Sequence, residues 1–430
     1  MHRFSFLLLL LISSGTAASR VYGASPLAPV PVNTDESKVS AYKLPELLVT
    51  ADGRRVADRE MWRSVRRPEL IEALATEVYG RTPVIPVHVH ARILTTRSDA
   101  VGGLATRTLV ELQPLADPAA PKFVLMLYVP NDARGPVPVL LGLNFSGPSS
   151  IENDPTLPQR DAARHGYVPK GKSVPMVTPG ADAAAWPLAL ALGRGYAVAT
   201  YFYGDLEPDR SDGWRIGLRG YLMKKEGRTA FRSDEWGAIG VWAWGLSRAL
   251  DYLQTEPRID ARRVAVFGHS RQGKTALWAG AQDERFAVVI SNDSGEGGAS
   301  LARRDFGERI TDSIRTYGYW YCENYRAFVG RPDARKTDQH MLLALAAPRA
   351  LYVASATEDT WADPRGEFLA AVEAAPAYRL FGFSGLGATK WPAPDQPVIG
   401  QRIGYHLRTG RHAILAYDWE RFIDFADRQW

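Results

Sequence analysis

The chain of 430 residues is long enough for one large domain or for two or three ordinary ones. Its composition, 46% hydrophobic and 23% charged residues, is typical of a globular protein with ample apolar surface for a core. The net charge of +5 comes from scattered lysines and arginines without a basic tract, so we expect no nucleic-acid partner. The one cysteine, Cys322, excludes an internal disulfide.

Residues 1–18 have the features of a signal peptide. A positive charge comes first, Phe4 to Ile12 form an apolar stretch too short to span a bilayer, and small residues follow. The pattern indicates cleavage after Ala17 or Ala18, with Ala24 as a weaker site. We therefore expect a secreted or periplasmic bacterial protein that has no membrane contact after the signal is cleaved.

The next part of the chain, from 19 to 59, reads as an irregular leader rich in Pro, Ser and Val. Residues 60–80 have helical spacing of apolar residues and end at a glycine. Three strand-like runs follow, and the period-two alternation of the first two indicates an antiparallel start to a sheet. These runs span 87–96, 106–115 and 123–130.

From residue 137 onwards, near-continuous apolar runs alternate with helical patterns. Buried strands that alternate with helices predict a mostly parallel, doubly wound α/β sheet. The sequence shows no internal repeat and no Gly/Ser linker, so we expect a single catalytic domain over 60–430. The predicted strands span 137–147, 195–205, 263–268, 286–293, 349–356 and 378–385, and the predicted helices span 235–254 and 274–282.

The stretch "GHSRQGK" at 268–274 follows the apolar run "RVAVF" and precedes a predicted helix. A strand, a sharp turn with a serine at its tip and a helix form the nucleophile elbow of the α/β-hydrolase fold. Gln272 stands where the second glycine of G-x-S-x-G belongs, and Gly273 comes one residue later. We expect Ser270 to be the nucleophile and the chain to have the α/β-hydrolase fold.

A serine nucleophile needs a general base, which in this fold follows the serine on a loop near the C-terminus. Two histidines in "GYHLRTGRHAIL" meet this condition. His406 lies in an alternating run and is expected to be a strand residue. His412 follows the loop signal Thr409–Arg411, so we favour His412 as the base.

The base needs a carboxylate on its other nitrogen, which fixes the tautomer and stabilises the imidazolium. Asp359 follows a predicted strand, the usual place for this acid, and Glu358 and Asp363 are alternatives in the same loop. Asp293, in "SNDSGEGG" at the end of the preceding strand, is a second candidate.

Three long stretches together resemble the bacterial glucuronoyl esterases of carbohydrate esterase family 15. The whole match runs in order from about residue 60 to the end of the chain. The three stretches lie at 267–308 ("FGHSRQGK" to "DFGE"), 354–369 ("ASATEDTWADPRGEFL") and 404–427. The resemblance implies hydrolysis of esters between 4-O-methyl-glucuronic acid on xylan and lignin alcohols, by a serine triad without metal.

The resemblance also implies roles for individual residues. It implies Ser270 as nucleophile, His412 as base and Arg271 as an oxyanion-hole donor. It implies substrate contacts from three further residues, which are Lys274, Glu308 and Trp361.

The acid is where this sequence departs from the family pattern. Many members carry glutamate after the earlier strand, where this chain has the shorter Asp293. Other bacterial members use an aspartate two residues before the tryptophan, which corresponds to Asp359. We favour Asp359 and keep Asp293 as a partner or substitute.

Two cations, Arg271 and Lys274, lie within four residues after the serine, although cations at the first turn of a helix oppose its dipole. This local cost favours functional roles for Arg271 and Lys274 over those of solvated helix-start residues. The alternatives are an acetyl-xylan or general carboxylesterase, which needs only the triad, and an inactive carbohydrate-binding relative. No histidine pattern matches a metal-ligand spacing, so we expect no metal and no other cofactor. We also expect a monomer.

Overall fold

The computed structural model describes residues 31–165, 173 and 176–430, and the predicted signal peptide lies outside the described residues. Within this part of the chain, ten strands form one sheet in the order β1-β2-β3-β5-β4-β6-β7-β8-β10-β9. The strands are β1 (His90–Asp99), β2 (Ala105–Gln113), β3 (Phe123–Pro130), β4 (Val137–Asn144), β5 (Ala197–Phe202), β6 (Ile259–His269), β7 (Val288–Asn292), β8 (Ala350–Ala356), β9 (Val398–Ile399) and β10 (Ile403–Arg408).

Strand direction divides the sheet into two parts. Strands β1, β2, β3 and β5 pair antiparallel in succession, as does β9 with β10. The strands from β5 through β4, β6, β7 and β8 to β10 are all parallel. The predicted mostly parallel sheet with antiparallel N-terminal strands is therefore confirmed.

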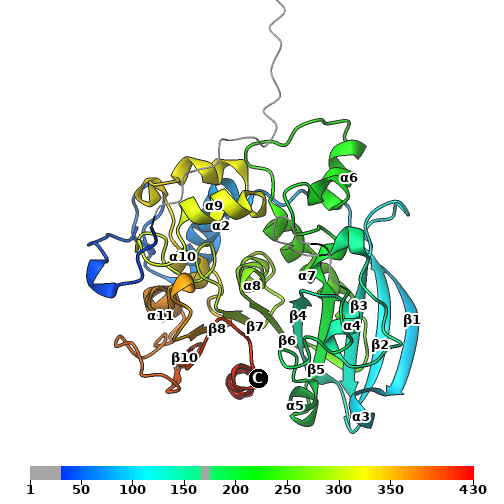
Figure 1. Ribbon diagram of the computed structural model, residues 1–430. Coiled ribbons are helices and arrows are strands. Elements are labelled where there is room, and N and C mark those ends of the chain that lie inside the picture. Colours follow the sequence, from blue (N-terminus) through cyan, green and yellow to red (C-terminus); the bar gives the residue numbers. More distant parts are fainter. Residues whose placement is uncertain (1–30, 166–172, 174–175) are drawn as a thin grey trace, which may run out of the picture.

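Helices cover both faces of this sheet (Figure 1). Figure 1 shows α7 and α8 with α2, α10 and α11 on one face, and α5 with the C-terminal helix α13 on the other. The α-helices are α1 (Arg59–Met61), α2 (Arg67–Leu74), α3 (Ala100–Gly103), α4 (Pro148–Ile151), α5 (Leu188–Gly193), α6 (Leu218–Lys225), α7 (Ala238–Leu253), α8 (Arg271–Gln282), α9 (Ile310–Tyr317), α10 (Gln339–Ala344), α11 (Pro364–Glu373), α12 (Ala375–Arg379) and α13 (Ala416–Ala426).

The central strands are buried on both sides, so their alternate residues enter two different cores. On β4, Val139 and Leu141 join the core under α7 and α8, whereas Leu140 joins the core under α5 and α13. Successive side chains of a strand point to opposite faces. This is why the sequence reads as continuous apolar runs there.

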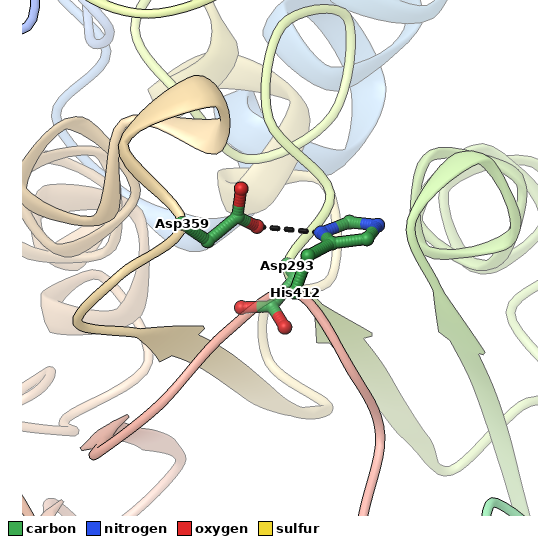
Figure 2. Close-up of side chains that lie close together, drawn as sticks. All are labelled: Asp293, Asp359 and His412. Carbon is green, nitrogen blue, oxygen red and sulfur yellow. Dashed lines mark hydrogen bonds and ion pairs between the residues drawn. The ribbon is translucent and has the colours of Figure 1, made fainter.

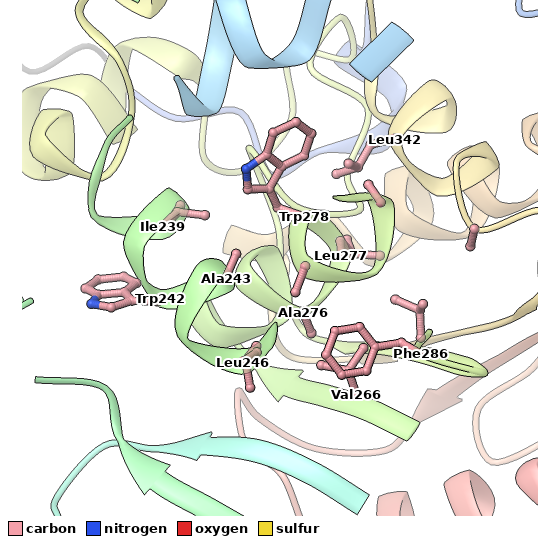
Figure 3. Close-up of a cluster of buried hydrophobic side chains, with 14 of the residues drawn as sticks. Ile239, Trp242, Ala243, Leu246, Val266, Ala276, Leu277, Trp278, Phe286 and Leu342 are labelled. Carbon is pink, nitrogen blue, oxygen red and sulfur yellow. The ribbon is translucent and has the colours of Figure 1, made fainter. Parts of the chain in front are cut away.

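Helices α7 and α8 pack closely on the sheet because they carry small residues at the contact. A Cβ at Gly245 would lie 2.2 Å from the hydroxyl of Tyr201, and one at Gly280 would lie 2.4 Å from a methyl of Val289. Figure 3 shows Ala243 of α7 and Ala276 of α8 at the contact between the two helices, whereas the larger Trp278 points away from α7. The close packing fixes α8, which begins at the predicted nucleophile.

The helix expected over 60–80 is present but is not uniform. Two π-helical stretches, Trp62–Arg66 and Ala75–Tyr79, flank α2, and the segment ends at Gly80 with a φ of 83°. A Cβ at Gly80 would lie 2.2 Å from the Cα of Trp236. Glycine is therefore required at this turn by both its φ and its close contact.

The prediction of a strand over 378–385 is wrong. Helix α12 extends to Arg379, and a turn follows in which Gly382 and Gly385 have φ values of 85° and 76°. Phe381 and Phe383 still pack against the core. The alternation of apolar residues in the sequence therefore comes from a turn that lies on the core, and not from a strand. Glycines with left-handed φ interrupt an extended backbone.

The described part of the predicted leader, residues 31–59, packs on later parts of the chain. The carboxylate of Glu36 pairs with Arg304 at 2.6 Å and with Arg365 at 3.1 Å. The carbonyl of Asn33 accepts a hydrogen bond from the N–H of Gly307 at 2.9 Å. The division into a leader and one catalytic domain stays a prediction. None of the helices among the described residues has the length and apolar character that a membrane span requires.

Trp278 is fully buried, and its ring stacks on Tyr79 with centroids 4.6 Å apart. We expect Trp278→Ala to lower the free energy of unfolding by about 3–5 kcal/mol, because the change leaves a large cavity in the core. Chemical denaturation of both proteins measures this difference. The control is Trp361→Ala, since Trp361 is 45% exposed and its removal should change stability little. A loss for Trp278→Ala as small as the one expected for Trp361→Ala would contradict the assignment of Trp278 to the core.

Candidate active site

Ser270 lies at the tip of a sharp turn between β6 and α8. Its backbone has a φ of 58° and a ψ of −130°, a conformation that residues other than glycine rarely adopt. Its N–H donates a hydrogen bond of 2.9 Å to the carbonyl of Asn292 at the end of β7. The predicted strand–turn–helix arrangement around Ser270 is present.

The displaced glycine of this turn has a steric explanation. A Cβ at Gly268 would lie 2.0 Å from the carbonyl oxygen of Gln272. Gly268 therefore makes room for the backbone of Gln272, the residue that replaces the second glycine of the G-x-S-x-G motif. A Cβ at Gly273 would lie 2.8 Å from the Cβ of Ser294, which follows β7. Gly273 thus lets α8 approach the adjacent loop, while the side chain of Gln272 is itself buried.

His412 lies on the loop after β10, and Asp359 lies on the loop after β8. The Nδ1 of His412 is 2.6 Å from Oδ2 of Asp359, which is a hydrogen bond that a neutral imidazole donates from Nδ1. Figure 2 shows the second ring nitrogen pointing away from Asp359. Asp359 is buried, whereas the His412 side chain is 44% exposed. The arrangement leaves one ring nitrogen of His412 for a proton that a substrate or nucleophile would exchange.

Hydrogen bonds join the two loops that carry these residues. The N–H of Thr357 donates to the carbonyl of Arg408 at 2.9 Å, and the N–H of Glu358 donates to the carbonyl of Gly410 at 2.8 Å. The N–H of Gly410 donates to the hydroxyl of Thr357 at 3.0 Å. The parallel pairing of β8 and β10 therefore continues into the loops.

Asp293 lies directly after β7 with a φ of 46°, and it is buried. Its Oδ2 accepts a hydrogen bond of 3.4 Å from the N–H of Ala413, the residue after His412. Burial, together with the charges of Glu367 and Asp359, raises its pKa well above the ordinary value. Asp293 therefore contacts the backbone of the histidine loop.

The other candidates lie in different environments. His406 is a buried strand residue, as expected, and its Nε2 is 2.8 Å from Asp418. Glu358 pairs at the surface with Arg411 at 3.3 Å. Asp363 caps α11 through the N–H of Gly366. Each of these side chains already has a partner that accounts for it.

His269, the residue before Ser270, is held in its neutral form. Its Nδ1 is 2.6 Å from Oδ1 of Asn292, and its ring centroid is 4.4 Å from that of His412. Burial, together with the charge of the neighbouring His412, lowers its pKa to about 3. A neutral His269 adds no positive charge beside the base.

The guanidinium of Arg271 folds inward instead of extending into solvent. Its Nη1 donates to Oδ2 of the buried Asp209, and its side chain is 16% exposed. It lies over the ring of Trp320 at 4.9 Å and over those of Phe145 and Tyr317 at 5.7 Å. A cation on aromatic rings beside a carboxylate is fixed in place before substrate binds.

Asp209 was not predicted from the sequence. Besides Arg271, it accepts hydrogen bonds from the hydroxyls of Tyr203 and Tyr319 and from Nε1 of Trp320, at 2.7 to 2.9 Å. It lies in "GDLEPD", shortly after β5, and an acid beyond the carboxyl end of a parallel strand was the signal that could have indicated it. Four donors hold this carboxylate, so it anchors Arg271.

Lys274 lies one turn into α8 and is buried. Its ammonium group donates to the carbonyl of Glu296 and to Oε2 of Glu308 at 3.5 Å. Burial raises the pKa of Glu308 to about 7, and the charge of Lys274 opposes this shift. Near neutral pH, Glu308 is therefore able either to donate or to accept a hydrogen bond.

Trp361 lies next to Glu308 through the backbone. The N–H of Glu308 donates to the carbonyl of Trp361 at 2.7 Å, and Gly307 at this contact has a φ of 64°. The residue as a whole is 45% exposed. An exposed aromatic ring beside a buried Lys–Glu pair is a combination suited to a sugar ring with hydroxyls.

Asp293, Asp359 and His412 also have the side-chain types of a metal site. One candidate ligand atom from each of them lies within 4.8 Å of the other two. Nδ1 of His412 already has Asp359 as its hydrogen-bond partner. The same geometry therefore suits a base with its acids.

The chain is similar to known esterases in both sequence and structure. The family model described as "Glucuronyl esterase, fungi" matches residues 229–382. The carbohydrate esterase MZ0003 of an unidentified prokaryote is 40% identical over 99% of this chain and 98% of its own length. A solved glucuronoyl esterase from Solibacter usitatus is 43% identical with a TM-score of 0.87, over 92% of this chain and all of that chain.

A second solved relative is described as a promiscuous family 15 esterase from a marine bacterial metagenome. It is 40% identical with a TM-score of 0.85, over 93% of this chain and 100% of that chain. Both likenesses therefore extend over more than nine tenths of this chain. The chain therefore belongs to carbohydrate esterase family 15, the glucuronoyl esterases, and is a carboxylic ester hydrolase with the α/β-hydrolase fold.

Proposed function

We propose that this protein hydrolyses esters between 4-O-methyl-glucuronic acid of glucuronoxylan and lignin alcohols. A relative from Phanerochaete chrysosporium, named 4-O-methyl-glucuronoyl methylesterase 1, is 36% identical over 45% of this chain and 42% of its own length. The observation that carries the proposal is the buried pair of Lys274 and Glu308 beside the exposed Trp361. A simple carboxylesterase needs no such group next to its nucleophile.

In the proposed reaction, the hydroxyl oxygen of Ser270 attacks the ester carbonyl carbon and gives its proton to His412. The imidazolium is stabilised by Asp359 through Nδ1. The tetrahedral intermediate collapses, the alcohol leaves with the proton from His412, and the glucuronoyl group remains on Ser270. Water then attacks this acyl-enzyme with His412 again as base, which releases the uronic acid and restores the serine.

The negative oxygen of the tetrahedral intermediate needs donors that are already in place. Arg271 supplies a backbone N–H at the start of α8, and its guanidinium is fixed by Asp209 and the aromatic rings. Because these groups do not reorganise when charge develops, they stabilise the oxyanion. Removing one such donor costs about 100- to 1,000-fold in rate.

The sugar preference is tested with Lys274→Met on two esters, benzyl glucuronate and p-nitrophenyl acetate. We expect kcat/KM on the glucuronate to fall by about 10- to 100-fold, since a charged hydrogen bond contributes about 1.5–3 kcal/mol. Activity on the acetate should change little. The control is Lys224→Met, at an exposed position of α6, which should leave both activities unchanged.

Two results of this experiment would change the assignment. An equal loss on both esters would make Lys274 a structural residue. A wild-type enzyme that prefers the acetate would favour the alternative, an acetyl-xylan or general carboxylesterase on the same fold.

The roles of the acids are tested by Asp359→Asn, Asp293→Asn and the double variant on a glucuronate ester. We expect Asp359→Asn to lower kcat most, because the amide favours the wrong imidazole tautomer; such an exchange costs about 10,000-fold in a serine protease triad. The double variant should lose more than either single one, without additivity, since both groups act on one loop. Ser270→Ala, the reference for residual activity, should be essentially inactive.

A crippling Asp293→Asn beside a nearly silent Asp359→Asn would reverse the assignment. Retention of a tenth or more of the wild-type kcat by Ser270→Ala would overturn the serine mechanism itself.

Asp293, Asp359 and His412 have side-chain types that can bind a metal ion, so we test directly whether the activity depends on metal. We expect full activity after dialysis against EDTA, since the proposed chemistry uses these groups as a base and its acids. Activity is measured before dialysis, after it, and after zinc is added back. A loss that zinc restores would show that the site is a metal centre.

A further inference from the structure

Arg408, the last residue of β10, is buried in the centre of the loop that carries His412. Its guanidinium donates hydrogen bonds to three backbone carbonyls of this loop. These are the carbonyls of Thr409 at 3.1 Å, Arg411 at 3.0 Å and Ala413 at 2.9 Å. The loop therefore curls around the guanidinium, and two of the bonds flank His412 on either side.

The opposite side of the guanidinium is anchored to the protein core. Its Nε is 3.2 Å from both carboxylate oxygens of Asp418. Asp418 also contacts Nε2 of His406 at 2.8 Å. It accepts a hydrogen bond of 2.7 Å from the N–H of Leu415, which lies at the start of α13. Because these partners belong to β10 and α13, Arg408 connects the histidine loop to rigid elements.

Arg408 also approaches the second acid. Its Nη2 is 3.7 Å from Oδ2 of Asp293, the same oxygen that accepts the N–H of Ala413. Asp293 and Arg408 thus act on the loop from the same side. The positive charge of Arg408 partly compensates two buried carboxylates, Asp293 and Asp418.

The side chain of His412 contacts Asp359 through a hydrogen bond and the ring of His269, whose centroid is 4.4 Å away. Its ring is 44% exposed and is oriented by its hydrogen bond to Asp359. The position of the ring relative to Ser270 therefore depends on the backbone of its loop. A displacement of about 1 Å at a reacting group costs up to about 100-fold in rate.

We propose that Arg408 is a positioning residue that holds His412 between Asp359 and Ser270 by fixing the backbone on both sides of it. This inference rests on the proposed role of His412 as the base. Arg408 acts through the loop and does not touch the substrate. The planar guanidinium is suited to this task, because it offers five N–H donors in fixed directions, whereas a lysine offers one compact charge.

The proposal is tested with Arg408→Lys and Arg408→Ala on an ester that the wild type hydrolyses. We expect Arg408→Lys to fold and to lower kcat by about 10-fold or more, with KM changed less than about twofold. Added guanidinium at millimolar concentration should restore part of the kcat of Arg408→Ala, whereas methylammonium should not. Arg402→Ala is the control, because Arg402 lies at the other end of β10, where it contacts Gln429.

Combination with Asp359→Asn gives a second readout. If Arg408 acts through His412, the two losses should not add, because both misplace the same imidazole. A folded Arg408→Lys with wild-type kcat, or additive losses in the double variant, would overturn the proposal. Failure of both Arg408 variants to fold, judged by circular dichroism, would also overturn it by assigning Arg408 to stability alone.

The choice of ester separates this proposal from the proposed function. If the wild type hydrolyses p-nitrophenyl acetate and not the glucuronate, the substrate assignment fails, and the Arg408 series is then measured on the acetate. If His412→Ala remains active on the chosen ester, the role of the base fails, and the Arg408 proposal fails with it.

Discussion

The turn at Ser270 is the constraint on which the rest of the site depends. A left-handed φ at a residue with a side chain costs of order 1–3 kcal/mol and persists only where the surroundings over-determine it. Here Gly268 has no side chain that would block the backbone of Gln272. The N–H of Ser270 donates a hydrogen bond to the carbonyl of Asn292 at the end of β7. The same turn starts α8, so it also sets where Arg271 and Lys274 lie.

Buried cations beside the turn are each matched by a buried acceptor. Arg271 has Asp209, and Lys274 has the carbonyl of Glu296 and the carboxyl of Glu308. An unpaired charge at these positions would cost several kcal/mol. Because these acceptors belong to the protein itself, the positive groups are fixed in direction. Such preorganisation is what stabilisation of a developing oxyanion requires.

The sequence indicated those parts of the structure that have a local signal. The parallel strands were visible as apolar runs, and the predicted fold class is confirmed. The run 378–385 was wrongly predicted as a strand because Phe381 and Phe383 are partly buried although they lie in a turn. Asp209 and Arg408 were not found, since they act through partners that only the fold brings near. The sequence left Asp293 and Asp359 as alternatives because both follow parallel strands, and only three-dimensional geometry distinguishes their contacts.

The two acids differ in what they reach. The carboxylate of Asp293 lies by the backbone N–H of Ala413 and by Arg408, whereas Asp359 lies against Nδ1 of His412. Burial also drives Asp293 toward its neutral form, and a neutral carboxyl stabilises an imidazolium less than an ionised one does. In the proposed mechanism, this favours Asp359 as the partner of the ring and leaves Asp293 to support the loop.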